Sequence, residues 1–538
     1  MADSESSTKD SLLLSVDRVQ VVTWRDLRDG SFTEELKRIT CFAAPMAAVV
    51  IAQFSLQIIS MVMVGHLGNL ALASASLASS FCNVTGFSFI IGLSCALDTL
   101  SGQAYGAKLY RKLGVQTYTA MFCLTLVCFP LSIIWFNMEK LLVFLGQDHS
   151  IAHEAGRYAA WLIPGLFSYA VLQPLTRYFQ NQSMIRPLLI TSSFVFCLHV
   201  PLCWLLVYKS GLGFLGGALA IGLSNWLYAV LLGSIMYFSS SCFETRAPLS
   251  MEIFSGVGEF FRYALPSAAM ICLEWWSYEL IILLSGLLPN PELETSVLSV
   301  CLQTIATVYS IPLAIAAAAS TRISNELGAG NSRAAHTVVY AVMSLAVMES
   351  LVVSMSLLVG RNVFGYVFSS DKDTVDYVAK MAPLVSISII LDGSQGVLSG
   401  PIFSSVFSLF LHMCNCQVLL NLHIEMSLHV YLQTHLLYNL LMDPHKFTTE
   451  VQGFMHVPVV PFLVQSQELL SHPKVVVILF SSTPNPATLA FWVHLKGVGL
   501  WVGIQAGAVL QTFLLALVTG CTNWEHQALE ARKRMALA

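Results

Sequence analysis

Residues 44–54 read APMAAVVIAQF, and residues 265–275 read LPSAAMICLEW, so one pattern of small and apolar residues around a proline occurs twice. The motifs VGHLGN (64–69) and SGLLPN (285–290) follow at the same spacing, so both pairs share one offset in numbering, 221. Each stretch belongs to an apolar segment of about 20 residues or more, the length of a membrane-spanning helix. The chain is therefore expected to contain two similar helical halves that lie in a membrane.

The repeat continues beyond these helices. GQAYGAK (102–108) corresponds to NELGAGN (325–331) at an offset of about 222, and YAAWLIP (158–164) corresponds to YVAKMAP (377–383) at 219. Internal symmetry of this kind is typical of transporters built from two lobes.

The composition of the whole chain supports a polytopic membrane protein. Of its 538 residues, 56% are hydrophobic and only 11% are charged, whereas a soluble domain has about 25% charged residues. The net charge of −4 and the absence of a basic run argue against a nucleic-acid partner. The 13 cysteines form no C-x-x-C pair, which argues against a zinc site and a disulfide framework.

Eleven apolar segments have the length of a membrane span, and a twelfth is expected in the ambiguous zone 401–490. The eleven lie near 40–64, 71–97, 115–136, 158–180, 188–208, 214–238, 262–288, 297–319, 336–360, 378–399 and 498–520. Most of the 27 Lys and Arg residues fall in the tails and the even-numbered loops, which places both termini in the cytoplasm. Two termini on one side require an even number of spans, and twelve is the expected total.

Six spans in each half give the two halves the same orientation, so the repeat is parallel and its pseudo-two-fold axis lies along the membrane normal. The expected fold is an all-α membrane protein of two six-helix lobes. The expected divisions are an N-terminal tail 1–38, an N-lobe 39–240, an inter-lobe loop 241–261, a C-lobe 262–400, an atypical segment 401–488, a twelfth-helix region 489–521 and a cytoplasmic tail 522–538.

The segment 401–488 departs from the repeat. GLGFLGGALA (211–220) pairs with KGVGLWVG (496–503) at an offset of about 283, so a long stretch of extra sequence has entered the second half. Residues 401–487 also hold seven of the 14 His and seven of the 19 Pro. One interpretation is a long loop with a degraded helix, and the favoured one is foreign sequence that replaces or disrupts the eleventh span.

Ionisable residues inside spans are costly, about 2.5–3.5 kcal/mol each at mid-bilayer, and so point to function. The candidates within the predicted spans are Asp98, Glu274, Glu279, Glu349 and Asp392. The repeat distinguishes two of them, because the N-lobe equivalents of Glu274 and Asp392 are the amides Gln53 and Gln173. We therefore expect proton coupling in the C-lobe and substrate contacts from the amides of the N-lobe.

The expected chemistry is reversible protonation of buried carboxylates, with a proton and a cationic substrate competing for one site. Glu279 is a third proton-coupling candidate, although it lies about 140° around the helix from Glu274. Aromatic residues beside these acids can hold flat cations. The remaining substrate-binding candidates are Trp275, Tyr278, Gln303, Tyr309 and Asn83. We expect no metal and no cofactor, since the histidines at 412, 423, 429 and 435 are irregularly spaced.

Several long motifs carry a family resemblance. They are MVGHLGNLALASASLASSFCNVTGFS (63–88), ALDTLSGQAYGA (96–107), CLEWWSYE (272–279), STRISNELGAGN (320–331) and LDGSQGVLSG (391–400). In these residues the chain resembles the plant branch of the multidrug and toxic compound extrusion (MATE) family, the DETOXIFICATION-type transporters. The resemblance covers about 35–400 and 489–525. It implies a twelve-helix antiporter that exports organic cations or other small metabolites in exchange for protons, and it points at Glu274 and Asp392 in such roles.

The leading hypothesis is thus a proton-coupled antiporter for small organic molecules, expected as a monomer in the plasma or vacuolar membrane. Three alternatives stay open: a lipid-linked sugar flippase of the same superfamily, a non-transporting membrane protein whose eleventh helix is lost, and a membrane enzyme. No catalytic constellation supports the last.

Overall fold

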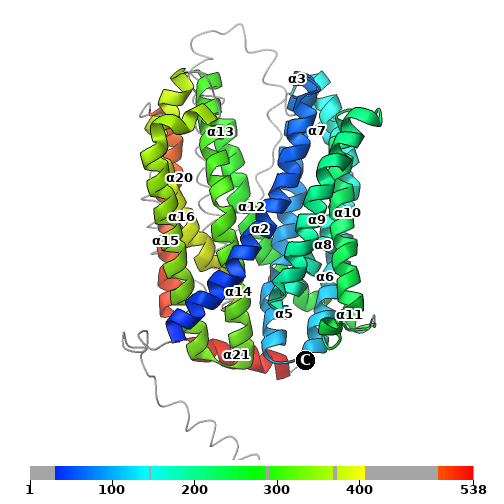
Figure 1. Cartoon of the computed structure of the whole chain (residues 1–538), viewed down its shortest axis with the longest axis vertical. Helices are drawn as coiled ribbons and strands as arrows, with labels where there is room; N and C mark the ends of the chain where they lie inside the picture. The colour runs from blue at the N-terminus through cyan, green and yellow to red at the C-terminus, as the bar shows by residue number, and fades with distance from the viewer. Residues whose placement is uncertain are drawn as a thin grey trace, which may run out of the picture.

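The computed structural model describes residues 31–405 and 495–536, apart from 145–146, 249, 286–287, 289 and 368–371. In this part of the chain the regular secondary structure is entirely helical (Figure 1). The predicted segment 401–488 lies almost wholly outside the described residues, and its replacement of the eleventh helix stays a prediction.

Long helices occupy every one of the eleven predicted spans. In the first half they are α2 (Ser31–Gly65), α3 (Asn69–Cys82) continued by η1 (Asn83–Phe87), α4 (Ser88–Ser94) and α5 (Ala96–Gly106), then α6 (Tyr110–Phe136), α8 (His149–Asn181), α9 (Ile185–Trp204) with η2 (Leu205–Lys209), and α10 (Leu215–Phe238). In the second half they are α12 (Val257–Ser285), α13 (Pro291–Val308), α14 (Ser310–Ala329), α15 (Ser332–Phe364), α16 (Lys372–Ser405) and α20 (Lys496–Cys521).

Shorter helices connect them. They are α7 (Met138–Phe144), η3 (Ser240–Cys242), α11 (Glu252–Ser255), η4 (Gly365–Val367) and the C-terminal α21 (Trp524–Ala536). Nine of the described segments are long and apolar enough to cross a membrane. The other two of the eleven predicted spans, α8 and α12, are not among these nine. Helix α8 carries Gln173 and Arg177, and α12 carries Glu274 and Glu279.

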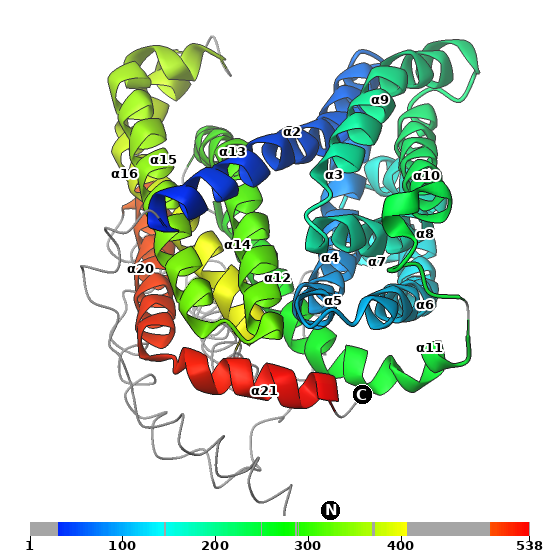
Figure 2. The same cartoon turned by 60° about the horizontal axis from the view of Figure 1, so that its bottom comes forward.

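The helices form two bundles that stand side by side in Figure 1. In the N-lobe, α8 packs on α6 and α10, and α9 packs on α2 and α10; in the C-lobe, α16 packs on α13, α14, α15 and α20. We call the end of the molecule at which α21 lies the α21 end. The bundles stand apart at the opposite end and approach each other at the α21 end, where α5 meets α14 (Figures 1 and 2).

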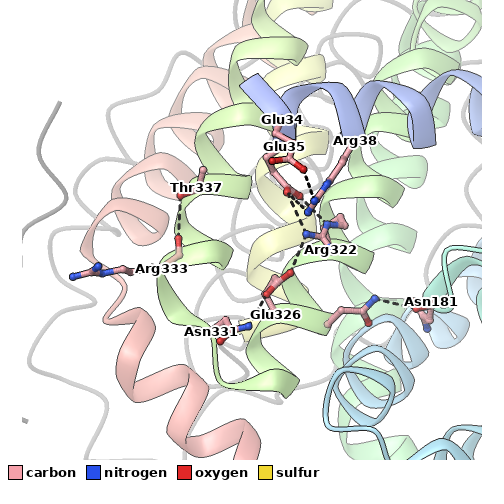
Figure 3. Close-up of polar contacts among 10 residues, drawn as sticks. Glu34, Glu35, Arg38, Asn181, Arg322, Glu326, Asn331, Arg333 and Thr337 are labelled. Atoms are coloured by element: carbon pink, nitrogen blue, oxygen red, sulfur yellow. Dashed lines mark hydrogen bonds and ion pairs between the residues drawn. The ribbon is translucent and has the colours of Figure 1, made fainter. Parts of the chain in front are cut away.

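Helix α2 crosses between the lobes. Figure 1 shows it running diagonally from the α21 end of the C-lobe to the far end of the N-lobe, and it packs on α14 and α15 as well as on α9 and α10. It begins at Ser31, inside the range predicted as a tail. The first turns are held by Arg322 of α14, whose Nε donates to Glu35 Oε1 at 2.7 Å and whose Nη2 donates to Glu326 at 2.9 Å (Figure 3).

The C-terminal helix α21 joins the two lobes at their base. It packs on α14, α15 and α5. Arg532 Nη2 donates to the carbonyl oxygen of Ala329 at 2.9 Å, and Arg534 Nη1 donates to Tyr263 Oη on α12 at 2.8 Å. The range predicted as a cytoplasmic tail, 522–538, therefore includes an ordered helix that connects the end of α14 to the start of α12.

Two predicted spans are interrupted at matching places. The second span changes from α-helix to a π-helical turn at Asn83–Phe87, and the eighth breaks between α13 and α14 at Tyr309. Phe87 and Tyr309 are separated by the repeat offset of 222, so the break is part of the repeat. π-helical turns often lie at functional sites, and interrupted helices commonly form the binding sites of membrane transporters.

Candidate functional site

Two of the predicted acids interact electrostatically inside the C-lobe. Glu274 lies about midway along α12, and Asp392 lies past the middle of α16 with 8% of its surface exposed. Tyr278, one turn after Glu274 and so on the same face of α12, donates its hydroxyl hydrogen bond to Asp392 Oδ2 at 3.4 Å. The hydrogen bond ties α12 to α16 at the level of both carboxylates.

Tyr309 completes the group at the break between α13 and α14. Gly396, one turn after Asp392, lies so close that a methyl group added there would stand 2.6 Å from Tyr309 Oη. Electrostatic interactions connect Glu274 with Asp392, and each acid with both tyrosines. We call Glu274, Tyr278, Tyr309 and Asp392 the carboxylate site.

The carboxylate site is suited to exchange of a proton against a cation. Two ionised carboxylates close together in a medium of low dielectric constant repel each other strongly. A bound proton or a bound cation relieves that repulsion, so either ligand is favoured and the two exclude each other. The two phenols supply a donor to the carboxylates and aromatic faces for a cationic ligand.

Glu279 lies on a different face of α12, as the helical angle predicts. Its Oε1 accepts a hydrogen bond from Ser80 Oγ of α3 at 2.8 Å. Trp276 lies nearby and donates its indole N–H to the carbonyl oxygen of Val84 at 3.0 Å. This face of α12 thus binds the N-lobe, and among the described contacts none joins Glu279 to the carboxylate site.

The amide candidates of the N-lobe lie on three different elements, Gln53 on α2, Asn83 on η1 and Gln173 on α8. Gln53 lies near the hydroxyl group of Tyr228, and Gln173 is buried on α8 with 7% of its surface exposed. Asn83 opens the π-helical turn η1. The structure therefore places these side chains in the N-lobe without joining them to the acids.

Two further candidates have side chains that make no described contact with the carboxylate site. Trp275 is partly exposed on α12, directly after Glu274, and Gln303 is exposed on α13, ahead of the break at Tyr309.

Sequence reasoning missed a buried ion pair in the N-lobe. Arg177 Nη1 of α8 lies 3.1 Å from Asp98 Oδ2 of α5, and both side chains are largely buried, 15% and 7% exposed. Asp98 is only a weak candidate in the sequence. Its partner lies two predicted spans further along the chain, and no residue near Asp98 indicates which basic residue that partner is. A search for one basic residue to match each acid within the spans would have found Arg177.

A second missed acid stabilises the C-lobe. Glu294, 2% exposed on α13, accepts a hydrogen bond from Tyr377 Oη at 2.8 Å and another from the backbone N–H of Gly497 at 3.0 Å. Gly497 lies in the first turn of α20, where backbone N–H groups have no partner within the helix. Glu294 therefore joins α13, α16 and α20.

Comparison with known proteins gives a consistent result. The sequence profile of the MatE family matches residues 45–205 and 266–414. Protein DETOXIFICATION 12 and Protein DETOXIFICATION 13 of Arabidopsis thaliana are 72% and 73% identical to the chain, with alignments that cover all of it and 99% of each relative. The profile match extends to residue 414, beyond the limit at 400 expected for the resemblance.

Solved structures agree with the sequence comparison. The crystal structure of the eukaryotic MATE transporter AtDTX14 is 45% identical in sequence and superposes with a TM-score of 0.77, covering 94% of this chain and 99% of that one. A Vibrio cholerae MATE transporter, at 13% identity, shares the fold with a TM-score of 0.73. The matched profile, the plant relatives and the two-lobed fold together show that the chain belongs to the MATE family of multidrug and toxic compound extrusion transporters.

Proposed function

We propose that the protein is a proton-coupled antiporter that exports small organic molecules, cationic xenobiotics or secondary metabolites, in exchange for protons. The observation that carries this proposal is the carboxylate site. Two acids and two tyrosines meet in the C-lobe, while the equivalent positions of the N-lobe hold the amides Gln53 and Gln173. At these positions the C-lobe can therefore change its charge, whereas the N-lobe can offer only hydrogen bonds.

In the proposed cycle the proton and the substrate occupy the carboxylate site in turn. With both Glu274 and Asp392 ionised, the site attracts a cation, and Tyr278 and Tyr309 contact it. A proton arriving from the acidic side neutralises one carboxylate, which weakens the attraction and favours release of the substrate. The residues proposed to contact the substrate from both lobes are Gln53, Asn83, Gln173, Trp275 and Gln303. For Glu279, which was expected to take part in proton coupling, we propose a structural role instead: it holds α12 against α3 through the hydrogen bond from Ser80.

We also propose that the α21 end faces the cytoplasm. The start of α2 and the helix α21 both lie there, and with them the basic residues Arg322, Arg333, Arg532 and Lys533, in keeping with the positive-inside rule. We expect a monomer in the plasma membrane or the vacuolar membrane. The bilayer supplies the remaining partner, since large apolar side chains such as Ile133, Val352 and Val359 are exposed on the outer surfaces of the helices.

The test is uptake of a fluorescent organic cation into proteoliposomes with an imposed pH gradient. We expect Glu274→Gln and Asp392→Asn each to abolish uptake driven by the gradient while the protein still accumulates and elutes as a single species. Gln53→Ala should weaken substrate binding but retain the dependence on the gradient. Undiminished uptake in both acid variants would refute the proposed site, and an equal loss in Gln53→Ala would move it to the N-lobe.

A parent chain that inserts correctly but moves no cation would instead favour the alternative of a non-transporting member of the family. Transport of a lipid-linked sugar in the same vesicles, without any effect of the pH gradient, would favour a flippase.

A further inference from the structure

The lobes are joined at the α21 end by a polar seam between α5, α8 and α14. Gln180 Nε2, at the end of α8, donates to the carbonyl oxygen of Ala317 and to Thr321 Oγ1, each at 3.4 Å. In the other direction, Asn325 Nδ2 of α14 donates to the carbonyl oxygen of Asn181 at 3.1 Å. The seam is thus made by the last residues of α8 in the N-lobe and by α14 from Ala317 to Asn325 in the C-lobe.

Glycines let α5 and α14 approach backbone to backbone in the same seam. Gly106 lies against the backbone of Asn325, and Gly328 lies against the backbone of Gln103, so close that a side chain at either glycine would collide with a main chain. The two glycines differ in number by 222, as do Gln103 and Asn325, so the two contacts are related by the repeat. The lobes are therefore closed against each other here around the pseudo-two-fold axis.

The missed ion pair lies directly beside this seam. Arg177 precedes Asn181 by one turn of α8, and besides Asp98 it donates to Gln180 Oε1 at 3.4 Å and to Cys95 Sγ at 3.5 Å. Asn181 Nδ2 in turn donates to the carbonyl oxygen of Leu97 at 2.9 Å. The end of α8 is thus held to the start of α5 by one ion pair and one hydrogen bond, and the same turn of α8 reaches across to α14.

The seam also connects to the carboxylate site. Helix α14 starts directly after Tyr309 and reaches the seam at Asn325, about 24 Å along a helix that rises 1.5 Å per residue. If Tyr309 is displaced when a proton or a cation binds, helix α14 would move with it as a rigid rod. The C-lobe side of the seam, which α14 forms, would therefore move too.

Many polar atoms in the seam have no partner. Within the described residues, seven of the sixteen buried side-chain N and O atoms without a hydrogen bond lie on α5, α8 and α14 beside the ion pair: Asp98 Oδ1, Ser101 Oγ, Arg177 Nε, Asn181 Oδ1, Ser320 Oγ, Ser324 Oγ and Asn325 Oδ1. Across the seam itself, the side-chain hydrogen bonds described are those donated by Gln180 and Asn325. The position of the last turn of α8, which carries Gln180 and Asn181, therefore decides whether these bonds form.

We infer that Arg177 and Asp98 are positioning residues for alternating access: together they hold the last turn of α8 where Gln180 and Asn181 close the lobes at the α21 end. The inference rests on the proposed transport function, because only a transporter needs this end to open and close. Neither residue touches the substrate in this role. Loss of the pair leaves the carboxylate site intact and shifts the protein toward the state that is open at the α21 end.

The test uses a cysteine reporter in the seam. Ser324 is fully buried on α14, its hydroxyl has no partner, and it faces Gly102 of α5, so Ser324→Cys is a nearly isosteric change. A membrane-impermeant maleimide is supplied from the side on which α21 lies, and labelling without the reporter substitution is subtracted. The variant Asp98→Asn with Arg177→Gln removes both charges together and leaves no unpaired buried ion, whereas loss of one partner is strongly destabilising.

We expect the neutral pair to raise the labelling rate of the reporter by about tenfold, which corresponds to about 1.4 kcal/mol between the closed and open states. Maximal transport should fall several-fold, because the state that is closed at the α21 end is then depleted. The matched control is Glu154→Gln with Arg157→Gln, which neutralises an exposed ion pair of 2.8 Å on the same helix, far from the seam. It should label and transport like the parent.

A labelling rate within twofold of the parent, in a neutral pair that folds, would overturn the inference. Should that variant fail to accumulate, Gln180→Ala gives the decision, because it removes the side chain that Arg177 contacts and that donates across to Ala317 and Thr321. Unchanged labelling in Gln180→Ala would again overturn the inference. Labelling requires no transport, so faster labelling together with an inactive parent would contradict the proposed function while the positioning role stood.

Discussion

Gly396 offers a direct test of the carboxylate site, because it bears no side chain and yet determines where Tyr309 lies. In Gly396→Ala the added methyl carbon would stand 2.6 Å from Tyr309 Oη, 3.0 Å from Cε2 and 3.1 Å from Cζ. Ordinary contact begins near 3.4 Å, so the hydroxyl must retreat by about 0.8 Å or α16 must move away from α13 and α14.

The expected cost is that of overpacking a closely packed site, about 1–3 kcal/mol. If the strain falls on the state in which Tyr309 contacts both acids, uptake driven by a pH gradient should fall roughly 5- to 100-fold, since each 1.4 kcal/mol is a factor of ten. The assay is initial uptake of a fluorescent cation into proteoliposomes, normalised to the amount of folded transporter. The matched control is Gly360→Ala on α15, where an added methyl group meets nothing within 4 Å.

A double variant shows whether the loss comes from this one contact. Tyr309→Phe removes the oxygen at 2.6 Å and leaves ring carbons at 3.0 Å and 3.1 Å. Tyr309→Phe lowers uptake by itself, so the informative quantity is the further effect of Gly396→Ala, which should be at least threefold smaller in the phenylalanine background than in the parent. Equal effects in both backgrounds, or a Gly396→Ala variant as active as Gly360→Ala, would refute the reasoning.

Three further predictions concern the other acids. Glu279→Gln should keep its dependence on the pH gradient, because the amide oxygen can still accept the hydrogen bond from α3; loss of that dependence would place Glu279 in proton coupling. Glu294→Ala leaves the Tyr377 hydroxyl and an N–H group of α20 without a buried partner. Each unsatisfied group costs about 1–3 kcal/mol, so the apparent melting temperature in detergent should fall by several degrees. A Tm equal to that of the parent would contradict this account of the C-lobe. Glu35→Gln weakens the largely buried contact with Arg322 that docks α2 on α14, and should sensitise the protein to proteolysis before α2 more than Glu34→Gln, whose side chain is 63% exposed.

Hydropathy and the repeat are sufficient to predict the helices, because a bilayer imposes one length on every spanning segment. The same repeat singles out Glu274 and Asp392, since a charge in one half is conspicuous beside an amide in the other. The helical angle correctly separates Glu279 from Glu274. The spans and the helical angle can be read from short windows of sequence, and the two acids can be found by comparing the halves at a constant offset. Both kinds of information are present in a single chain.

Contacts between distant helices could not be predicted in this way. Nothing near Asp98 indicates that Arg177 is its partner, and Glu294 looks like an ordinary loop acid until α16 and α20 are packed around it. The helix that follows 522 and the helical turns before 39 likewise fall in predicted tails, because their polar composition gives no sign of the lobes on which they pack. Packing between lobes decides each of these cases.

The repeat relates the ion pair and the carboxylate site to each other. At the offset of 219, the position of Arg177 corresponds to Gly396, and at 222 the position of Asp98 corresponds to Ser320. The C-lobe thus has a glycine and a serine where the N-lobe has a buried ion pair, and it has two acids where the N-lobe has two amides. A glycine at 396 is what allows Tyr309 to lie against α16, and an arginine at 177 is what fixes the end of α8. In the proposed function, two copies of one bundle have therefore taken different tasks through a few substitutions at equivalent positions: in one lobe two acids exchange a proton against the substrate, and in the other an acid is paired with an arginine that positions the seam.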